Sequence, residues 1–401
     1  MGINDLSKFF ESYLSQSPIF LNKKSLQGNY TPEDIPHRDD QIEQLATILA
    51  PALRMEKPSN VFIYGKTGTG KTCVTQHVMQ EILDISQKKN LNLKYYYLNC
   101  KLKKVADTEY RLIAQLARAF GKEVPATGLP TEEVYKLFLD SINSDNQLIV
   151  LILDEIDQLV AKTGDGILYN LTRLNSELTK CQLSIIGISN DLTFTDNLDP
   201  RIKSGLSEEE LLFPPYNAFQ LQDILRKRSL IAFQNNILDE GVIEKCAAYA
   251  AREHGDARRA LELLRVAGEL AERKNDSKIK LIHLDEAEDK IEKDRILDTI
   301  RTQPKQFQIV LYGILNVCGE DNKIFTGEVY EFYKKTCTKV NLKPLTQRRV
   351  SDIISEFDML GIINSRIISK GRYGRTKEIV VAIHSSTFPK IKEILKEGLG
   401  L

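Results

Sequence analysis

A glycine-rich segment near residue 65 has the composition of a loop that binds phosphate. It reads Gly65-Lys-Thr-Gly-Thr-Gly-Lys71-Thr72 and stands between a short apolar run and a stretch with helical periodicity. Glycines let consecutive backbone N–H groups turn toward an anion, and the following helix adds its positive dipole end. In this pattern Lys71 reaches the β- and γ-phosphates, and the Thr72 hydroxyl binds Mg²⁺. The predicted nucleotide-binding residues of the loop are Gly65, Lys66, Thr67, Gly68, Thr69, Gly70, Lys71 and Thr72.

Two consecutive carboxylates follow the longest apolar run of the chain. Residues 148–153 are all Leu, Ile or Val, and Asp154 and Glu155 come directly after them. Because open α/β sheets bind ligands at the carboxyl ends of their strands, these two side chains should meet the phosphate loop. Asp154 is expected to hold Mg²⁺ through its waters, and Glu155 to polarise the attacking water. Two solvated loop acids are the alternative.

Three further side chains are candidates for contact with the phosphates. Asn190 ends the next apolar run and could hydrogen-bond the γ-phosphate or the attacking water; a turn-forming Asn is the alternative. Arg201 follows a short helical segment and could act as an arginine finger on a neighbouring subunit's nucleotide, or be an ordinary surface arginine. Arg258 stands at the start of a helix and could lean onto the phosphates, which would couple the angle between domains to the nucleotide state.

The elements that must position these residues follow from apolar periodicity. Between residues 60 and 190, short apolar runs alternate with helix-length amphipathic stretches, which predicts an α/β fold with a parallel sheet and helices on both faces. From about residue 218 to 300 the period is helical almost throughout, as in a small bundle. After Pro304, three helix-like stretches precede a strand, a basic loop and a second strand, the order of a winged helix. The predicted domains are residues 1–217, 218–299 and 300–401.

The loop between the last two predicted strands is basic. Residues 366–377 hold five Lys or Arg side chains and no acid, and two glycines allow a tight hairpin tip. Such a finger suits phosphates and a minor groove, although many charge runs are only solvated surface. Just upstream, residues 345–357 place polar and basic side chains opposite an apolar face, as in a recognition helix. The predicted DNA contacts are Gln347, Arg348, Arg349, Ser351, Lys370, Arg372, Tyr373, Arg375 and Thr376.

The net charge of the 401-residue chain is zero, yet its charge is unevenly distributed. The whole chain holds 55 basic and 55 acidic side chains, and residues 300–401 hold 17 basic and 10 acidic ones. That region therefore carries +7, and the rest of the chain −7. Taken alone, a net charge of zero would argue against a polyanion such as DNA as a partner. The distribution instead predicts an acidic nucleotide-binding part attached to a basic part that reads DNA.

Cysteine, histidine and apolar patterns exclude other classes of protein. The six cysteines lie far apart, and no histidine stands at ligand spacing from another histidine or a cysteine, so we expect neither a disulfide framework nor a zinc site. The longest apolar run is far shorter than the roughly 20 residues that cross a bilayer. With no signal peptide pattern at the start, we expect a cytoplasmic protein, associated with the nucleoid and not with a membrane.

In this order, the motifs resemble those of AAA+ ATPases, and in finer detail the archaeal replication initiators related to the origin recognition complex and its helicase-loading partner. The resemblance covers nearly the whole chain, and its more specific marks are residues 35–38, 99–100, 213–216 and 255–258. It implies an AAA+ P-loop domain with a Rossmann-like parallel sheet, an all-α lid and a C-terminal winged helix. By resemblance, the base pocket is lined by Ile35, Pro36, His37, Arg38 and Tyr216.

The resemblance also implies a function. It is that of an ATP-switched initiator that binds double-stranded origin DNA, helps to recruit or load the replicative helicase and works with other initiator subunits. ATP or ADP and Mg²⁺ are the implied ligands, and hydrolysis would be a slow reset. Initiators carry an insertion that touches DNA in the region of residues 101–130. Lys104, Thr108 and Arg111 are therefore candidates there, with a packing helix as the equal alternative.

Other ATPases share parts of this pattern. Holliday-junction branch-migration motors combine the same core with a winged helix, but Asn99-Cys100 and the extra segment after it argue against that interpretation. Transcription or signalling regulators usually carry a further sensor domain, and none is visible. Clamp-loader subunits share the Asp154-Glu155 pair, yet they commonly carry Ser-Arg-Cys where this chain has Pro200-Arg201-Ile.

Overall fold

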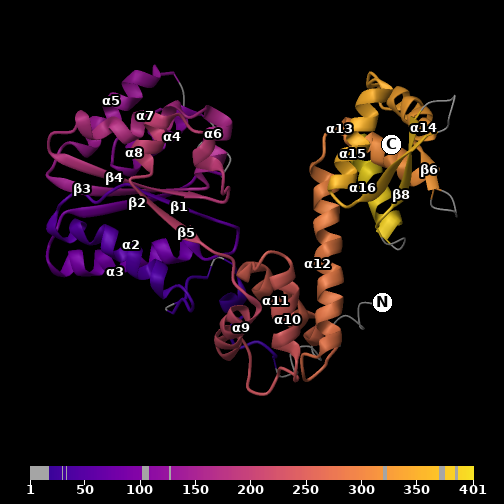
Figure 1. The fold of residues 1–401 in the computed structure, drawn as a ribbon, viewed down its shortest axis with the longest axis horizontal. Coiled ribbons are helices and arrows are strands. Elements are labelled where there is room, and N and C mark those ends of the chain that lie inside the picture. Colours follow the sequence, from indigo (N-terminus) through magenta and orange to yellow (C-terminus); the bar gives the residue numbers. More distant parts are fainter. Residues whose placement is uncertain are drawn as a thin grey trace, which may run out of the picture. The chain divides into compact units, whose positions relative to one another are not determined.

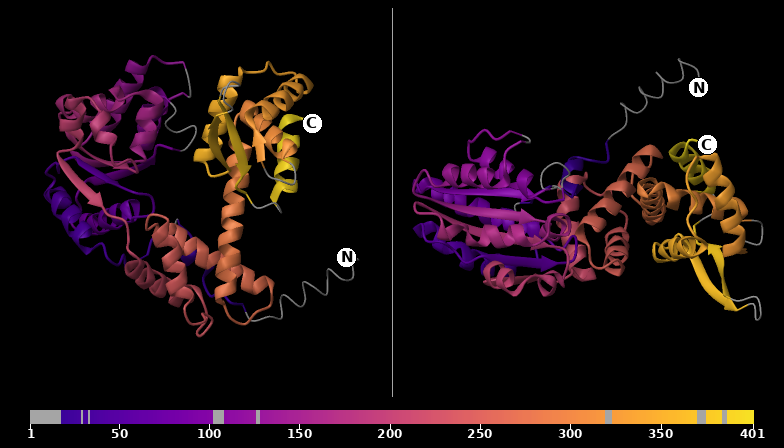
Figure 2. Two further views of the ribbon diagram at one scale, coloured as in Figure 1. Left: turned by 45° about the vertical axis from the view of Figure 1, so that its right-hand side comes forward. Right: turned by 90° about the horizontal axis from the view of Figure 1, so that it is seen from above.

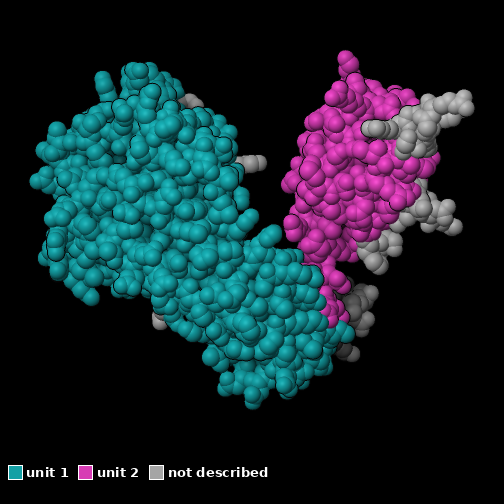
Figure 3. Space-filling model, viewed as in Figure 1, with its two compact units in different colours: residues 1–284 teal, residues 285–401 magenta. Residues whose placement is uncertain are grey.

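The computed structural model describes most of the chain, in two compact units. The described residues are 18–28, 30–32, 34–101, 108–125, 128–318, 323–369, 375–383 and 387–401. The units are Met1–Leu284 and Asp285–Leu401 (Figure 3). The first unit holds the predicted nucleotide-binding region and most of the predicted lid, whose last residues, 285–299, fall in the second unit. The three domain boundaries drawn from the sequence stay predictions.

A parallel five-stranded sheet forms the centre of the first unit, in the order β2-β3-β4-β1-β5. Its strands are β1 (Val61–Gly65), β2 (Leu93–Asn99), β3 (Gln147–Asp154), β4 (Cys181–Ser189) and β5 (Glu209–Phe213). Every residue of β3 is buried, because this strand is covered on both faces and flanked on both edges. The register pairs Asn99 with Asp154 and Tyr64 with Ser189, so that these polar strand ends share one edge of the sheet.

Helices cover both faces of this sheet (Figure 1, Figure 2). One face packs against α2 (Asp39–Leu49) and α3 (Lys71–Lys88). The other packs against α4 (Glu109–Ala119), α5 (Thr131–Ile142), α6 (Ile156–Thr163), α7 (Gly166–Arg173) and α8 (Pro200–Leu206). The first unit also contains short 3₁₀ turns: η1 (Lys23–Leu26), η2 (Ala50–Arg54), η3 (Leu174–Ser176) and η4 (Phe194–Asn197). The predicted α/β fold is confirmed.

A bundle of helices forms the lid of the first unit. It contains α9 (Ala218–Ala232), α10 (Val242–Arg252) and α11 (Ala257–Arg273). A capping box starts α9, in which the Asn217 side chain accepts from the Gln220 N–H and the Gln220 side chain accepts from the Asn217 N–H. On α11 the residues Leu261, Leu264 and Ala267 are buried at helical spacing, in agreement with the helical period predicted for this region. The chain then enters α12 (Leu281–Thr302), which continues into the second unit.

The second unit is a winged helix, as predicted. After α12 come α13 (Lys305–Val317), β6 (Lys323–Phe325), α14 (Thr326–Lys339), α15 (Gln347–Met359), β7 (Ile363–Ser369), β8 (Arg375–Val381) and α16 (Phe388–Leu399). The antiparallel sheet has the order β6-β8-β7. The sequence interpretation missed α16, whose proline stands in its first turn and whose Ile391, Ile394 and Leu395 are buried at helical spacing. Within the described ranges, no helix is long and apolar enough to cross a membrane.

Candidate functional site

A cavity of about 860 Å³ opens between the phosphate loop and the lid of the first unit. This volume lies in the range of cavities that hold a small ligand or cofactor. The phosphate loop, the polar strand ends and helices α9 and α11 all contribute to its lining. The loop residues in the lining are Gly68, Thr69, Gly70, Lys71 and Thr72.

The phosphate loop requires glycine at two of its positions. Gly68 and Gly70 have φ values of +72° and +94°, which side chains other than glycine rarely adopt. A Cβ atom at Gly68 would also lie 1.6 Å from the Asp256 carboxyl, because the start of α11 approaches the loop closely. There the Ala257 N–H donates to the Gly68 carbonyl at 3.2 Å. The first turn of the lid helix therefore touches the loop itself.

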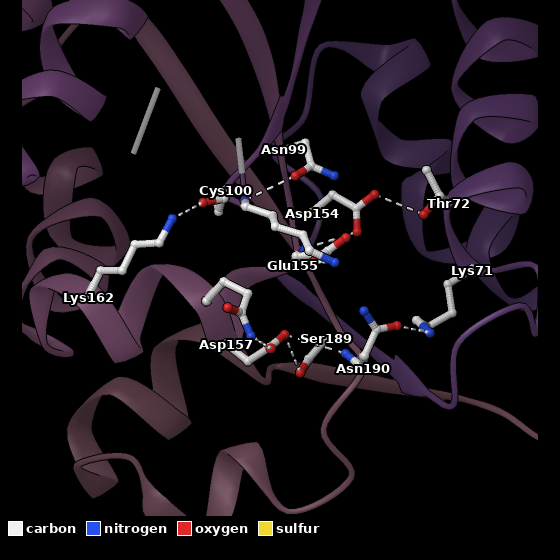
Figure 4. A network of polar contacts seen from close by, with 12 residues as sticks. Lys71, Thr72, Asn99, Cys100, Asp154, Glu155, Asp157, Lys162, Ser189 and Asn190 are labelled. Atoms are coloured by element: carbon white, nitrogen blue, oxygen red, sulfur yellow. Dashed lines mark hydrogen bonds and ion pairs between the residues drawn. The ribbon is translucent and has the colours of Figure 1, made fainter. Parts of the chain in front are cut away.

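Lys71 is buried at the bottom of the loop. Its Nζ donates to the carbonyls of Gly65 at 2.7 Å and Lys66 at 2.8 Å. It also donates to Asn190 Oδ1 at 2.8 Å, as Figure 4 shows. Burial lowers the pKa of Lys71 to about 8, although the Asp154 carboxylate opposes this shift. The predicted phosphate-binding lysine and the predicted polar end of β4 thus lie together, and a bound anion would raise the pKa of Lys71 again.

The Asp154 carboxylate is held by three donors. Its Oδ2 accepts from the Thr72 hydroxyl at 2.8 Å and from the Tyr97 hydroxyl at 2.7 Å, and its Oδ1 accepts from the Glu155 N–H at 2.9 Å. Burial, together with the hydrogen bond to Asp154, raises the pKa of Tyr97. The adjacent hydroxyl and carboxylate oxygens of Thr72 and Asp154 are hard ligands that fit Mg²⁺, which keeps waters and substrate phosphates as its other ligands.

Glu155 occupies a strained backbone position beside the predicted metal ligand. Its φ of 55° lies in the left-handed region, and the residue directly follows β3 and occupies the N-cap position of α6 without a side-chain capping bond. Its Oε2 lies 3.4 Å from Lys101 Nζ, and the Lys101 N–H donates to Asn99 Oδ1 at 3.0 Å. Figure 4 shows Asn99 and Glu155 close to Asp154. Across the described ranges, no group of three or more His, Cys, Asp or Glu side chains could hold a metal ion by itself.

The residues assigned by resemblance to the base pocket separate into two sets. Ile35, Pro36 and Tyr216 line the cavity. His37 and Arg38 are not among the lining residues: His37 Nε2 lies 3.1 Å from Asp223 Oδ2 on α9, and Arg38 is buried under the loop with 2% of its surface exposed. Contact of any of these residues with a base stays a prediction.

Arg228 on α9 is a candidate that the sequence interpretation missed. It lines the cavity with 8% of its surface exposed, and its Nη1 has no hydrogen-bond partner within the described part of the chain. Its guanidinium lies 4.6 Å from the centre of the Tyr30 ring, and burial lowers the pKa of Arg228. A signal was present, because Arg228 falls on the apolar face of α9 with Leu221, Ile224 and Leu225. An unpaired buried donor in a cavity points to a ligand.

The two other predicted arginines differ in position. Arg258 stands in the first turn of α11 and lines the cavity, so the structure brings it to the phosphate loop. Arg201 is exposed in the first turn of α8, where its N–H donates to Asp199 Oδ1 at 2.8 Å. It is not among the residues that line this cavity. A role toward a neighbouring subunit stays a prediction.

Helix α15 of the second unit presents the predicted recognition residues. Val350, Ile353, Ile354 and Phe357 are buried, whereas Gln347, Arg348 and Arg349 are exposed in the first turn and Ser351 is half-buried. Arg349 Nη1 lies 3.9 Å from both Asp352 Oδ2 and Glu356 Oε1, a distance at which exposed pairs interact weakly. The first turn of α15 therefore offers accessible cations and an amide.

The basic finger is described only at its base. Lys370, Arg372 and Tyr373 lie outside the described residues; Arg375 begins β8, and Thr376 is half-buried beside it. Two of its five cations serve the fold: Arg366 pairs with Glu378 across the strands, and Lys377 Nζ donates to the Ser351 carbonyl at 2.9 Å and to the Ser355 hydroxyl. Lys377 thus joins β8 to α15.

The candidates in the region of residues 101–130 surround the start of α4. Thr108 is the N-cap of this helix, and its Oγ1 accepts from the Arg111 N–H at 3.3 Å. Both residues are exposed, and Lys104 lies outside the described residues. The cap explains Thr108 by local structure alone, and a DNA contact at Thr108 or Arg111 stays a prediction.

Three family models match successive parts of the chain. They are an AAA domain over residues 54–193, a Cdc6 AAA+ ATPase-type lid domain over residues 222–289, and a CDC6 C-terminal winged helix domain over residues 298–389. Their order agrees with the sheet, lid and winged helix seen in the structure. The matches to these family models support a nucleotide-binding region that is separate from the winged-helix region.

Individual relatives match nearly the full length of the chain. The ORC1-type DNA replication protein of Thermococcus onnurineus is 52% identical, over 99% of this chain and 95% of the relative. ORC1-type DNA replication protein 1 of Methanosarcina mazei is 52% identical, over 94% and 91%. The solved structure of the Aeropyrum pernix ORC1 protein in complex with DNA is 43% identical, covers 95% of this chain and 98% of that chain, and has a TM-score of 0.83. The chain therefore belongs to the family of ORC1-type DNA replication proteins.

Proposed function

We propose that this protein is an ATP-dependent replication initiator that binds origin DNA and helps to recruit or load the replicative helicase, with slow ATP hydrolysis as its switch. The observation that carries the proposal is the single cavity in which the phosphate loop, Asp154 and the lid arginines Arg228 and Arg258 converge. Family membership supports the initiator over a branch-migration motor or a regulator. Origin DNA, the helicase and other initiator subunits are the proposed partners, in the cytoplasm at the nucleoid.

The nucleotide is held from three sides. The loop amides and Lys71 bind its phosphates, the lid arginines close over it, and the segment of Ile35 and Pro36 with Tyr216 meets its base. Thr72 and Asp154 would hold Mg²⁺, which supplies charge neutralisation on the β- and γ-phosphates. Glu155 orients the attacking water. Asn190, which is already hydrogen-bonded to Lys71, hydrogen-bonds the γ-phosphate or that water.

Slow hydrolysis agrees with the position of Glu155. Its Oε2 lies 3.4 Å from the Lys101 ammonium, a contact that competes with the water that Glu155 is proposed to orient. An arginine finger would complete the site by stabilising the charge that develops during transfer, and Arg201 is the proposed finger toward a neighbouring subunit. Turnover then depends on assembly, so hydrolysis stays slow in the isolated protein.

DNA binding is assigned to the second unit. Helix α15 is proposed to enter the major groove through Gln347, Arg348 and Arg349, and the finger around Arg372 and Arg375 to enter the minor groove. The charge of +7 in residues 300–401 attracts the phosphate backbone. The A. pernix ORC1 protein, whose solved structure is a complex with DNA, supports DNA binding by this chain.

Genome-wide mapping of the protein on DNA tests the proposal. We expect a few discrete sites that share repeated sequence motifs, with occupancy lost in the Lys71→Ala variant. Occupancy spread over many transcribed regions would support a regulator, and accumulation at recombination junctions with rapid ATP turnover would support a motor.

A further inference from the structure

Arg38 is a buried cation whose partners are backbone carbonyls. It stands just before α2, and its Nε donates to the Thr69 carbonyl at 2.8 Å. Its Nη2 donates to the Pro214 carbonyl at 2.5 Å, and its Nη1 to the His37 carbonyl at 3.4 Å. Only 2% of its surface is exposed, so these hydrogen bonds replace the water that a guanidinium would otherwise bind.

Aromatic rings complete the surroundings of this guanidinium. Its central carbon lies 3.9 Å from the centre of the Tyr216 ring and 5.6 Å from that of Phe213. Burial lowers the pKa of Arg38, and Tyr216 opposes this shift. The flat faces restrict the plane of the guanidinium, so that its N–H groups point at fixed carbonyls. Lysine has neither the planar fork nor the stacking face to reproduce this arrangement.

The contact with Thr69 determines how one loop peptide is oriented. In a trans peptide the C=O and the following N–H point in opposite directions, so the Gly70 N–H points away from Arg38. Thr69 and Gly70 line the nucleotide cavity, whereas Arg38 does not. By holding the Thr69 carbonyl, Arg38 keeps this N–H turned to the side of the loop where an anion binds.

The contact with Pro214 ties the same guanidinium to the base of the lid. Pro214 belongs to the short segment between β5 and α9, and Tyr216, which stacks on Arg38, follows in that segment. One buried side chain therefore connects the phosphate loop with the segment from which the lid starts. A change in the loop peptide and a change in the lid segment both alter the hydrogen bonds of Arg38.

We propose that Arg38 is a positioning residue, which holds the phosphate loop to the start of the lid and does not contact the base. The proposal rests on the proposed nucleotide binding and differs from the base-pocket role that the resemblance implies for Arg38. The two roles predict different ligand preferences. A residue that contacts the base distinguishes adenine from guanine, whereas a residue that aligns the loop strengthens the binding of any nucleotide with the same phosphates.

The test measures ADP and GDP affinities of the Arg38→Met and Arg38→Lys variants by calorimetry. We expect Arg38→Met to weaken both nucleotides together by a factor of about 10 to 100, as for the loss of a charge-assisted hydrogen bond, with the ADP-to-GDP ratio unchanged. Arg38→Lys should restore only part of the affinity. Arg226→Met on α9, an exposed arginine that does not line the cavity, is the control and should bind like the unmodified protein.

Hydrogen exchange provides a second measurement that does not depend on a ligand. In the nucleotide-free Arg38→Met variant, peptides that cover residues 68–71 should exchange faster, while those of the buried strand β3 stay protected. If Arg38→Met does not fold, the nucleotide affinities and the loop exchange are compared between Arg38→Lys and the unmodified protein. Loss of the ADP-to-GDP preference, or unchanged affinity and loop exchange in both variants, would overturn the proposal. Normal ADP binding by Lys71→Ala would instead overturn the nucleotide site itself.

Discussion

The nucleotide site and the recognition surface of the winged helix use charged side chains in opposite ways. In the nucleotide site Arg38, Lys71 and Asp154 are 2–5% exposed and already hydrogen-bonded to neighbouring groups. On α15 Arg348 and Arg349 are exposed to solvent. A small anion needs donors with a fixed geometry, because each of its few contacts must be made well. A polyanion needs accessible cations, because binding releases counterions wherever the cations meet phosphate.

Within the winged helix, too, some cations bond to neighbouring groups of the protein and others are exposed. Arg366 and Lys377 belong to the basic finger by sequence, yet they pair with Glu378 and with α15 respectively. These contacts resemble those of the nucleotide site, since they hold elements in place. The cations at the base of the finger therefore support the surface, and DNA contact by Lys370, Arg372 and Arg375 stays a prediction.

Replacement of Lys71 should give the largest effect on nucleotide binding. Lys71→Ala removes a buried cation that three acceptors already orient, and we expect ATP affinity to fall by roughly 100- to 1,000-fold or more. Equilibrium binding of a fluorescent ATP analogue measures the change. Lys88→Ala, at the exposed far end of α3, is the matched control. Normal ATP affinity in Lys71→Ala would remove the phosphate-loop assignment.

Replacement of Glu155 should separate binding from turnover. Glu155→Gln keeps the size of the side chain but removes the base, so hydrolysis should fall by about 100- to 10,000-fold while ATP affinity stays unchanged. Single-turnover phosphate release measures the rate. Wild-type hydrolysis in this variant would exclude Glu155 from catalysis. Reduced ATP affinity would mean that Glu155 mainly supports the cavity.

On the DNA side, finger cations should change the salt dependence of binding. If Arg372 and Arg375 both meet phosphates, the double alanine variant should bind duplex DNA more weakly, with a slope of log affinity against log salt that is shallower by about 1.8. Fluorescence anisotropy over a salt series measures both quantities. Unchanged affinity in the double variant would refute the proposed role of the finger.

Lys377→Met sharpens the same comparison, since it removes a cation that bonds within the protein. We expect weaker DNA binding with an unchanged salt slope, because Lys377 positions α15 and is not proposed to meet phosphate. A slope that becomes shallower by about 0.9 would show that Lys377 contacts a phosphate in the complex.

The smallest effect should be a dependence of ATP affinity on pH. The free protein holds the pKa of Lys71 at about 8, and bound phosphates raise it. Affinity should therefore stay level below about pH 7 and fall above pH 8, by at most about tenfold per pH unit, with uptake of a proton on binding. Calorimetry in buffers of different ionisation enthalpy measures that proton. Constant affinity from pH 7 to 9 would contradict the role of the ammonium.

Much of the fold and part of the candidate site could be predicted from local patterns. The phosphate loop, the Asp154-Glu155 pair and the buried face of α15 are each continuous in sequence, so their periodicity and glycine spacing indicate their conformation. Helix α16 was missed although its apolar spacing was readable. Arg228 was missed because a single arginine on the apolar face of a helix belongs to no recognisable sequence motif.

The sequence by itself determined that this chain carries a phosphate loop followed by paired carboxylates, a helical lid and a basic winged helix. Backbone conformation over a few residues suffices for such features. Only the tertiary structure decided that Tyr97 donates to Asp154, that Arg38 lies under the loop and that Lys377 binds α15. These partners come from separate strands and helices. Strand register and side-chain packing bring them together, and neither is encoded in the local spacing of residues.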